Sequence, residues 1–92
     1  MRFIKVARVA KELIGGKNND FLLGEKEENI PIDDIIRIRK WNKSEIDNRF
    51  FKDQDLTAVD IVDRSKPDGG KKTIVIAEGE DSFIERLGSF KK

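Results

Sequence analysis

Arg37, Arg39 and Trp41 are the residues of this sequence whose types and spacing are best suited to chemistry. They lie two positions apart, and a strand places residues at that spacing on one face. Arginine side chains hold phosphates and an indole ring stacks on a base, so this face predicts a contact with nucleic acid. Lys40 and Lys43 add positive charge at its end. The competing interpretation is a solvated outer face, because charged residues opposite a buried face are typical of an antiparallel sheet.

A second group of cations surrounds a turn-rich segment further along the chain. Its members are Arg64, Lys66, Lys71 and Lys72. If the fold brings this group beside the arginine face, the two form one basic patch, and otherwise both are ordinary surface charge. The two groups together are the candidate surface for nucleic acid or another partner.

The spacing of the acidic residues does not predict a metal site or a catalytic site. Asp53-Gln54-Asp55 resembles part of a calcium loop, but the required glycine and the terminal bidentate glutamate are missing. Asp60 and Asp63 have opposite strand parity, so their side chains diverge. The sequence contains no cysteine and no histidine, which excludes disulfides, thiolate chemistry, the usual zinc sites and Ser-His or Cys-His nucleophile pairs. We therefore expect no enzyme, no metal and no cofactor.

Composition predicts a single small domain that spans residues 1–92. Hydrophobic residues make up 37% and charged residues 40% of the chain, yet the apolar residues are periodic, which argues against disorder. The 19 basic residues nearly cancel the 18 acidic ones, so no global charge attracts nucleic acid or an anionic membrane. The first eight residues lack the apolar block of a signal peptide, and no apolar run approaches the ~20 residues that span a bilayer. We expect a soluble cytoplasmic protein without membrane contact.

The segment from Leu56 to Leu87 predicts an antiparallel hairpin. Val59 and Ile61 alternate with polar or small residues, and Ile74 and Ile76 do the same after the turn. This period of two is the pattern of a half-buried strand. The connection at 65–70 contains proline, Asp-Gly and Gly-Gly, which favour a long exposed turn.

A short helix is expected after this hairpin. Ser82 and Glu85 have the spacing of a capping box, with the serine as N-cap. Phe83, Ile84 and Leu87 then form the inward stripe.

The N-terminal part of the chain is less regular. Residues 3–10 suit either a strand or a helix, and we favour a strand from Phe3 to Val9 followed by a helical turn from Lys11 to Ile14. A second short strand is expected at 21–23, and the acidic run at 25–29 is expected to be a solvated loop.

The middle of the chain predicts a third informative region. Residues 32–35 suit a turn or a short 3₁₀ segment that leads into a strand, with Ile36 and Ile38 on its inward face. Residues 42–55 are polar and irregular, so we expect either a mobile loop or one that folds back through Phe50 and Phe51.

These elements together predict a mainly β, α+β fold: a small antiparallel meander of about five strands with a short C-terminal helix. The expected core consists of Ile4, Val6, Phe21, Leu23, Ile36, Ile38, Val59, Ile61, Ile74, Ile76, Phe83, Ile84 and Leu87.

Two segments resemble known families. The pairing of IPIDDIIRIRKW with KKTIVIAEGEDSFIERL, after an opening Phe3-Ile4-Lys5-Val6 strand and a second strand at Phe21, resembles the small β-meander of the flagellar FlbD-like family. The phrase IPIDDIIRI also resembles the start of LytTR-type DNA-binding domains. The chain departs from the first in its longer segments at 42–55 and 65–71, and from the second in lacking histidine and a clear basic recognition segment. Either resemblance implies a regulatory or binding module.

We therefore expect a non-catalytic protein-interaction or regulatory module, with a protein partner or a second copy of the chain as its ligand. Partner burial would add stability, since a meander leaves two open edges. The alternative is a nucleic-acid-binding regulator that uses the arginine and tryptophan face.

Overall fold

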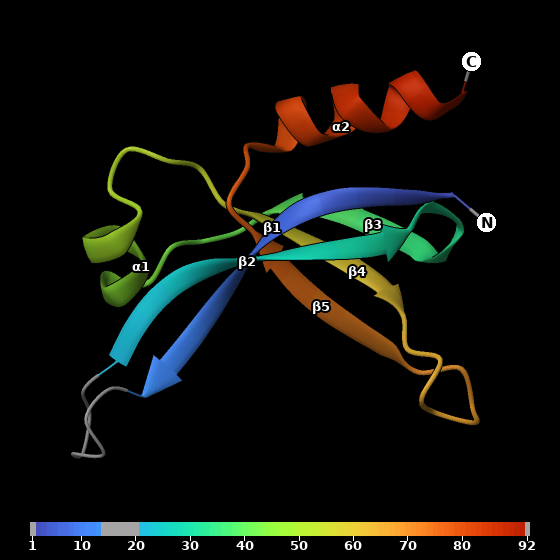
Figure 1. The fold of residues 1–92 in the computed structure, drawn as a ribbon, viewed down its shortest axis with the longest axis horizontal. Helices are drawn as coiled ribbons and strands as arrows, with labels where there is room; N and C mark the ends of the chain where they lie inside the picture. Colours follow the sequence, from blue (N-terminus) through green and yellow to red (C-terminus); the bar gives the residue numbers. More distant parts are fainter. Residues whose placement is uncertain (1, 14–20, 92) are drawn as a thin grey trace.

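The computed structural model, which describes residues 2–13 and 21–91, contains an antiparallel sheet of five strands flanked by short helices (Figure 1). The strands are β1 (Phe3–Leu13), β2 (Phe21–Pro31), β3 (Ile35–Lys40), β4 (Thr57–Val62) and β5 (Lys71–Ile76). The helices are α1 (Glu45–Phe50) and α2 (Glu80–Gly88), with 3₁₀ turns at η1 (Ile32–Asp34) and η2 (Ser89–Lys91). The predicted antiparallel sheet with a short C-terminal helix is confirmed.

The strand order is β2-β1-β5-β4-β3. Consecutive strands are neighbours from β3 to β5, as the predicted meander requires, but the meander is interrupted between β2 and β3. β1 pairs with both β2 and β5, and η1 connects β2 to β3. As a result, β2 and β3 follow each other in the chain but lie at opposite edges of the sheet. The 3₁₀ turn predicted before β3 is confirmed.

The predicted β4–β5 hairpin is confirmed with the expected faces. Val59 pairs with Ile74 in the register, and all the inward aliphatic side chains of the hairpin are buried. Gly69 in the connection has φ of 73°, a left-handed conformation that glycine adopts without a Cβ clash.

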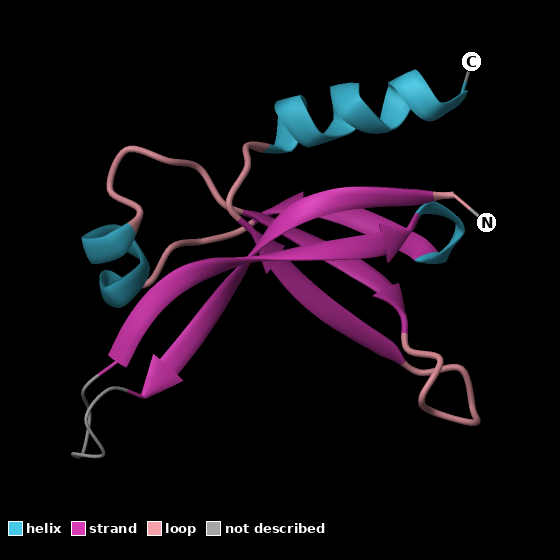
Figure 2. Cartoon of the chain, in the orientation of Figure 1, coloured by secondary structure: helices cyan, strands magenta, loops and turns pink. Residues whose placement is uncertain are grey.

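One face of the sheet, which we call the inner face, packs against α2 (Figure 2). Seven of the predicted core residues are buried there: Ile4, Val6, Val59, Ile61, Ile74, Ile76 and Phe83. Ile38, Leu87 and Phe90 pack against them and are partly buried, and Ile30 belongs to the same cluster although the sequence did not single it out. The side chains of Phe21 and Leu23 lie outside the described part of the chain.

β1 and β2 pair with each other, and both are longer than the strands predicted at 3–9 and 21–23. β1 continues to Leu13, so the helical turn expected from Lys11 is wrong for 11–13, and Ile14 lies outside the described residues. The acidic run at 25–29 is part of β2 instead of a loop. Cross-strand pairs of opposite charge explain why these residues suit a strand, since Lys5 lies 3.9 Å from Glu27.

Helix α2 begins at Glu80 with Gly79 as its N-cap, so the predicted capping box at Ser82 is wrong. The Ser82 hydroxyl instead donates to Glu78 Oε2 at 2.8 Å. Ile84 is 48% exposed, and its predicted place in the core is wrong as well. The helix buries Phe83 and packs Leu87 against the sheet, and Phe90 of η2 packs there as well. Ile84 lies about 100° around the helix axis from Phe83.

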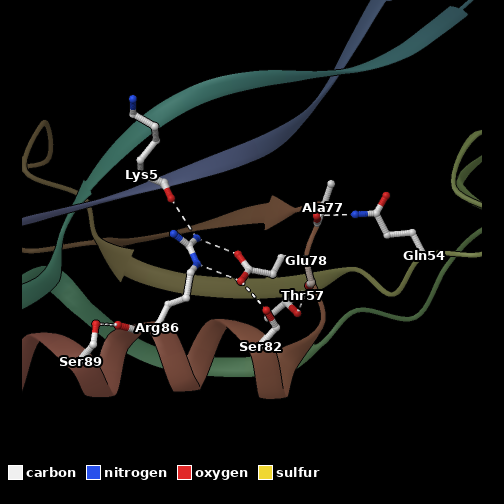
Figure 3. A network of polar contacts seen from close by, with 8 residues as sticks. All are labelled: Lys5, Gln54, Thr57, Ala77, Glu78, Ser82, Arg86 and Ser89. Atoms are coloured by element: carbon white, nitrogen blue, oxygen red, sulfur yellow. Dashed lines mark hydrogen bonds and ion pairs between the residues drawn. The ribbon is translucent and has the colours of Figure 1, made fainter.

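A polar network centred on Glu78 holds α2 to the sheet (Figure 3). Arg86 donates from Nη2 and Nε to the two carboxylate oxygens of Glu78 at 2.7 and 2.9 Å, and Nη2 also donates to the carbonyl of Lys5 in β1 at 2.9 Å. Thr57 in β4 donates to the carbonyl of Glu78. Partial burial acts to raise the pKa of Glu78, but the hydrogen bonds from Arg86 and Ser82 outweigh it and lower that pKa.

Candidate interaction surfaces

A β-bulge in β3 decides which residues the arginine face presents. Ile35 pairs with Ile61 but Arg37 pairs with Asp60, so one extra residue is inserted between them. The bulge turns both Ile36 and Arg37 toward the face opposite α2, which we call the outer face. Ile36 is 47% exposed, and its predicted inward position is wrong because the alternation is broken there.

Arg39 makes an ion pair on the outer face. Its Nε lies 3.2 Å from Oδ2 of Asp60, and Thr73 of β5 donates to Oδ1 of the same carboxylate. The hydrogen bonds from Arg39 and Thr73 hold the pKa of Asp60 below its usual value. The guanidinium of Arg39 is thus paired with a carboxylate of the same chain.

Trp41 and Lys43 also have internal partners. The indole ring packs against a second apolar cluster, and its Nε1 donates to Asp47 Oδ2 at 3.1 Å. Lys43 donates to the carbonyls of Phe51 and Gln54 at 2.9 and 3.0 Å. Both residues therefore stabilise the fold of the segment that follows β3.

That segment, residues 41–56, folds back onto the outer face. Ser44 and Asp47 form a reciprocal capping box at the start of α1. Phe51 is buried with Leu56, whereas Phe50 is exposed. The segment therefore folds back as predicted, but only the ring of Phe51 anchors it. Serine followed three residues later by an acidic side chain is the signal that marks this helix start.

The second cation group is divided between different parts of the surface. Arg64 donates two hydrogen bonds to the buried carboxylate of Asp34. These bonds lower the pKa of Asp34 below its usual value. Lys71 pairs with Val62 and shares the outer face with Arg37. Lys72 is opposite Ile61 and belongs to the inner face, and Lys66 is exposed in the connecting loop. Of the cations in the two predicted groups, the structure places Arg37, Arg39 and Lys71 on the outer face, and Lys40 and Lys72 on the inner face.

A cavity of about 240 Å³ lies at the start of α2, lined by Lys40, Asp55, Leu56 and residues 79–82. Its lining includes three acidic residues and one lysine. Nowhere in the described ranges do three or more acidic side chains gather in a way that could hold a metal ion.

The β3 edge combines exposed apolar, charged and main-chain groups. The amide of Trp41 donates to the carbonyl of Leu56 at 3.0 Å, so the hydrogen-bonded pairs with β4 fall on the odd residues of β3. The main-chain groups of Ile38 and Lys40 therefore point toward the open edge. Among the described residues, Arg37 and Lys40 make no hydrogen bond or ion pair with another side chain.

Comparison with known protein families, characterised proteins and solved structures finds no match to this chain. Within residues 2–13 and 21–91, no helix is long and apolar enough to cross a membrane. The surface of the chain is therefore the basis for a functional proposal.

Proposed function

We propose that this chain is a non-catalytic interaction module that binds a protein partner along the β3 edge. The observation that carries the proposal is the pair Ile36 and Arg37, which the bulge turns outward together. Ile36 is a large aliphatic residue with about half of its surface exposed. The neighbouring Arg37 is exposed as well and makes no hydrogen bond or ion pair with another described residue, although its charge helps to lower the pKa of Asp60. An exposed apolar side chain beside an exposed arginine suits a docking surface.

The open edge also determines the form of the partner. An extended segment that joins a sheet edge gains main-chain hydrogen bonds, and its alternate side chains meet the two faces. Here the available main-chain groups are those of Ile38 and Lys40, and the adjacent charges are positive. The matching partner is an extended acidic segment that carries an apolar side chain for Ile36.

Nucleic acid is the alternative ligand, and it stays a prediction. Phosphate-driven binding falls steeply as salt rises. Arg39, Trp41 and Lys43 have internal contacts. In the described part of the chain, Arg37 and Lys40 are therefore the members of that candidate face that make no hydrogen bond or ion pair with another side chain. Both resembled families imply a regulatory or binding module, which agrees with either ligand.

The test measures fluorescence anisotropy with two labelled probes, a peptide that alternates valine and glutamate and a single-stranded oligonucleotide. We expect the peptide to bind. Arg37→Glu should weaken that binding about tenfold, the equivalent of ~1.4 kcal/mol. Ile36→Ser should weaken peptide binding as well, because it removes the apolar contact.

Lys52→Glu is the matched control, since it makes the same charge change at an exposed position in the segment 41–56. It should leave peptide binding unchanged. If the oligonucleotide binds at ~50 mM salt and the peptide does not, the partner is nucleic acid and the proposal is wrong.

A further inference from the structure

The two open edges of the sheet carry opposite charge. β2 has Glu25, Glu27 and Glu28 with a single lysine among them, whereas β3 has three cations and no acid. The strand order places these two strands at opposite edges of the sheet. A molecule that is nearly neutral as a whole therefore has an acidic edge and a basic edge.

The exposed charges at the two edges match in face. On β3, Arg37 is exposed and lies on the outer face. On β2, Glu25 is exposed and also lies on the outer face, because it pairs with Val9. Glu28 of β2 is used within the chain, since its Oε1 lies 3.2 Å from Nη1 of Arg8 and its Oε2 is buried.

We infer that the partner of the β3 edge is the β2 edge of a second copy of this chain, with Arg37 beside Glu25. The inference rests on the proposed function and names its ligand. Four successive antiparallel pairings make β2 and β3 run in the same direction, so the second copy continues the sheet through a parallel pair.

Charge also excludes the other ways of joining two edges. Two β2 edges would bring glutamates together, and two β3 edges would bring cations together, and like charges on facing strands repel. Only the unlike pairing is attractive. Such a contact is head-to-tail, so it builds a ring or an open chain of copies instead of a twofold dimer.

The experiment is a charge exchange followed by sedimentation velocity. Arg37→Glu places two glutamates beside each other in the contact, and Glu25→Arg places two arginines beside each other there. Both positions are exposed and unpaired among the described residues, so both variants should keep the native circular dichroism spectrum. Each alone should associate about tenfold more weakly than the unchanged chain, and an equimolar mixture of the two should recover association, because each variant then supplies an edge that fits the other.

The unchanged chain should exceed its monomer mass of 10.6 kDa as concentration rises at about 10 mM salt and return to it at about 1 M, where screening is nearly complete. Association should also slow hydrogen exchange at the amides of Ile38 and Lys40. A monomer at all concentrations and low salt, no recovery in the mixture, or association without this protection would each overturn the inference. Binding of the valine-glutamate peptide without self-association would refute this inference and leave the proposed function standing.

Discussion

Truncation of Phe83 and of its neighbour Ile84 should have very different costs, although the sequence pattern assigns both to the core. Phe83 is fully buried between α2 and the sheet, and loss of such a ring costs about 3–5 kcal/mol. Ile84→Ala removes three carbons, or roughly 2.4 kcal/mol if they were fully buried. Because Ile84 is 48% exposed, about half of that free energy is lost on truncation. The better helix propensity of alanine offsets the loss by a few tenths of a kcal/mol. The net expectation for Ile84→Ala is about 1 kcal/mol or less.

Urea denaturation followed by circular dichroism measures both changes. With a slope of about 1–3 kcal/mol per molar urea, Phe83→Ala should lower the midpoint by at least ~1 M, and Ile84→Ala by less than that. A chain of 92 residues has a total stability of roughly 5–14 kcal/mol, so Phe83→Leu serves as the milder variant if the alanine chain has no folded baseline. Equal losses at the two positions would refute the assignment of Phe83 to the inward side of α2 and of Ile84 to its exposed side.

Three further changes test the polar contacts. Ser44→Ala removes the acceptor of the α1 capping box and should cost ~1 kcal/mol in urea melts, with faster amide exchange confined to α1; unchanged exchange there would contradict the cap. Thr57→Val leaves the carbonyl of Glu78 without its donor at a fully buried position, so we expect a loss of ~1–3 kcal/mol, and a melt like that of the parent would contradict it. Arg64→Ala should destabilise at pH 7 but much less at pH 2. Because Arg64 lowers the pKa of Asp34 in the folded chain, the ionised carboxylate stabilises the fold at pH values above the unfolded pKa of about 3.9. This stabilisation disappears as the pH falls through the folded pKa. An equal loss of stability at both pH values would show that the ion pair is not the source of the destabilisation.

The β4–β5 hairpin and the inward stripe of α2 were predictable because local pattern and tertiary environment agree there. Val59 and Ile74 are β-branched residues in strict alternation, and both are buried in register with one another. The same rule failed at Ile36, because it assumes an unbroken alternation. A single inserted residue reverses the faces, and nothing in the residue types of β3 marks where the insertion falls.

Two identical motif spacings show why the capping signals gave one wrong answer. Ser82 has an acidic residue three positions later, as Ser44 does, but only Ser44 acts as an N-cap. At α2 the preceding residues join the helix, and the hydroxyl of Ser82 bonds to Glu78, which Arg86 also holds. The hydroxyl of Ser82 thus bonds to a side chain that is itself held by tertiary contacts, and the local sequence motif does not predict this bond.

The distribution of charge follows from topology instead of composition. Glu25 and Arg37 are close in sequence, and the nearly equal numbers of acidic and basic residues suggest that their charges cancel. The insertion of β1 between β2 and β5 separates them by the full width of the sheet. Charges so far apart are screened from each other at physiological salt, where the Debye length is about 8 Å, so each edge acts on an approaching partner with its own sign. The near-neutral total therefore does not oppose binding at the β3 edge. With so small a net charge, two copies do not repel each other as wholes, and the acidic edge of one copy can attract the basic edge of another.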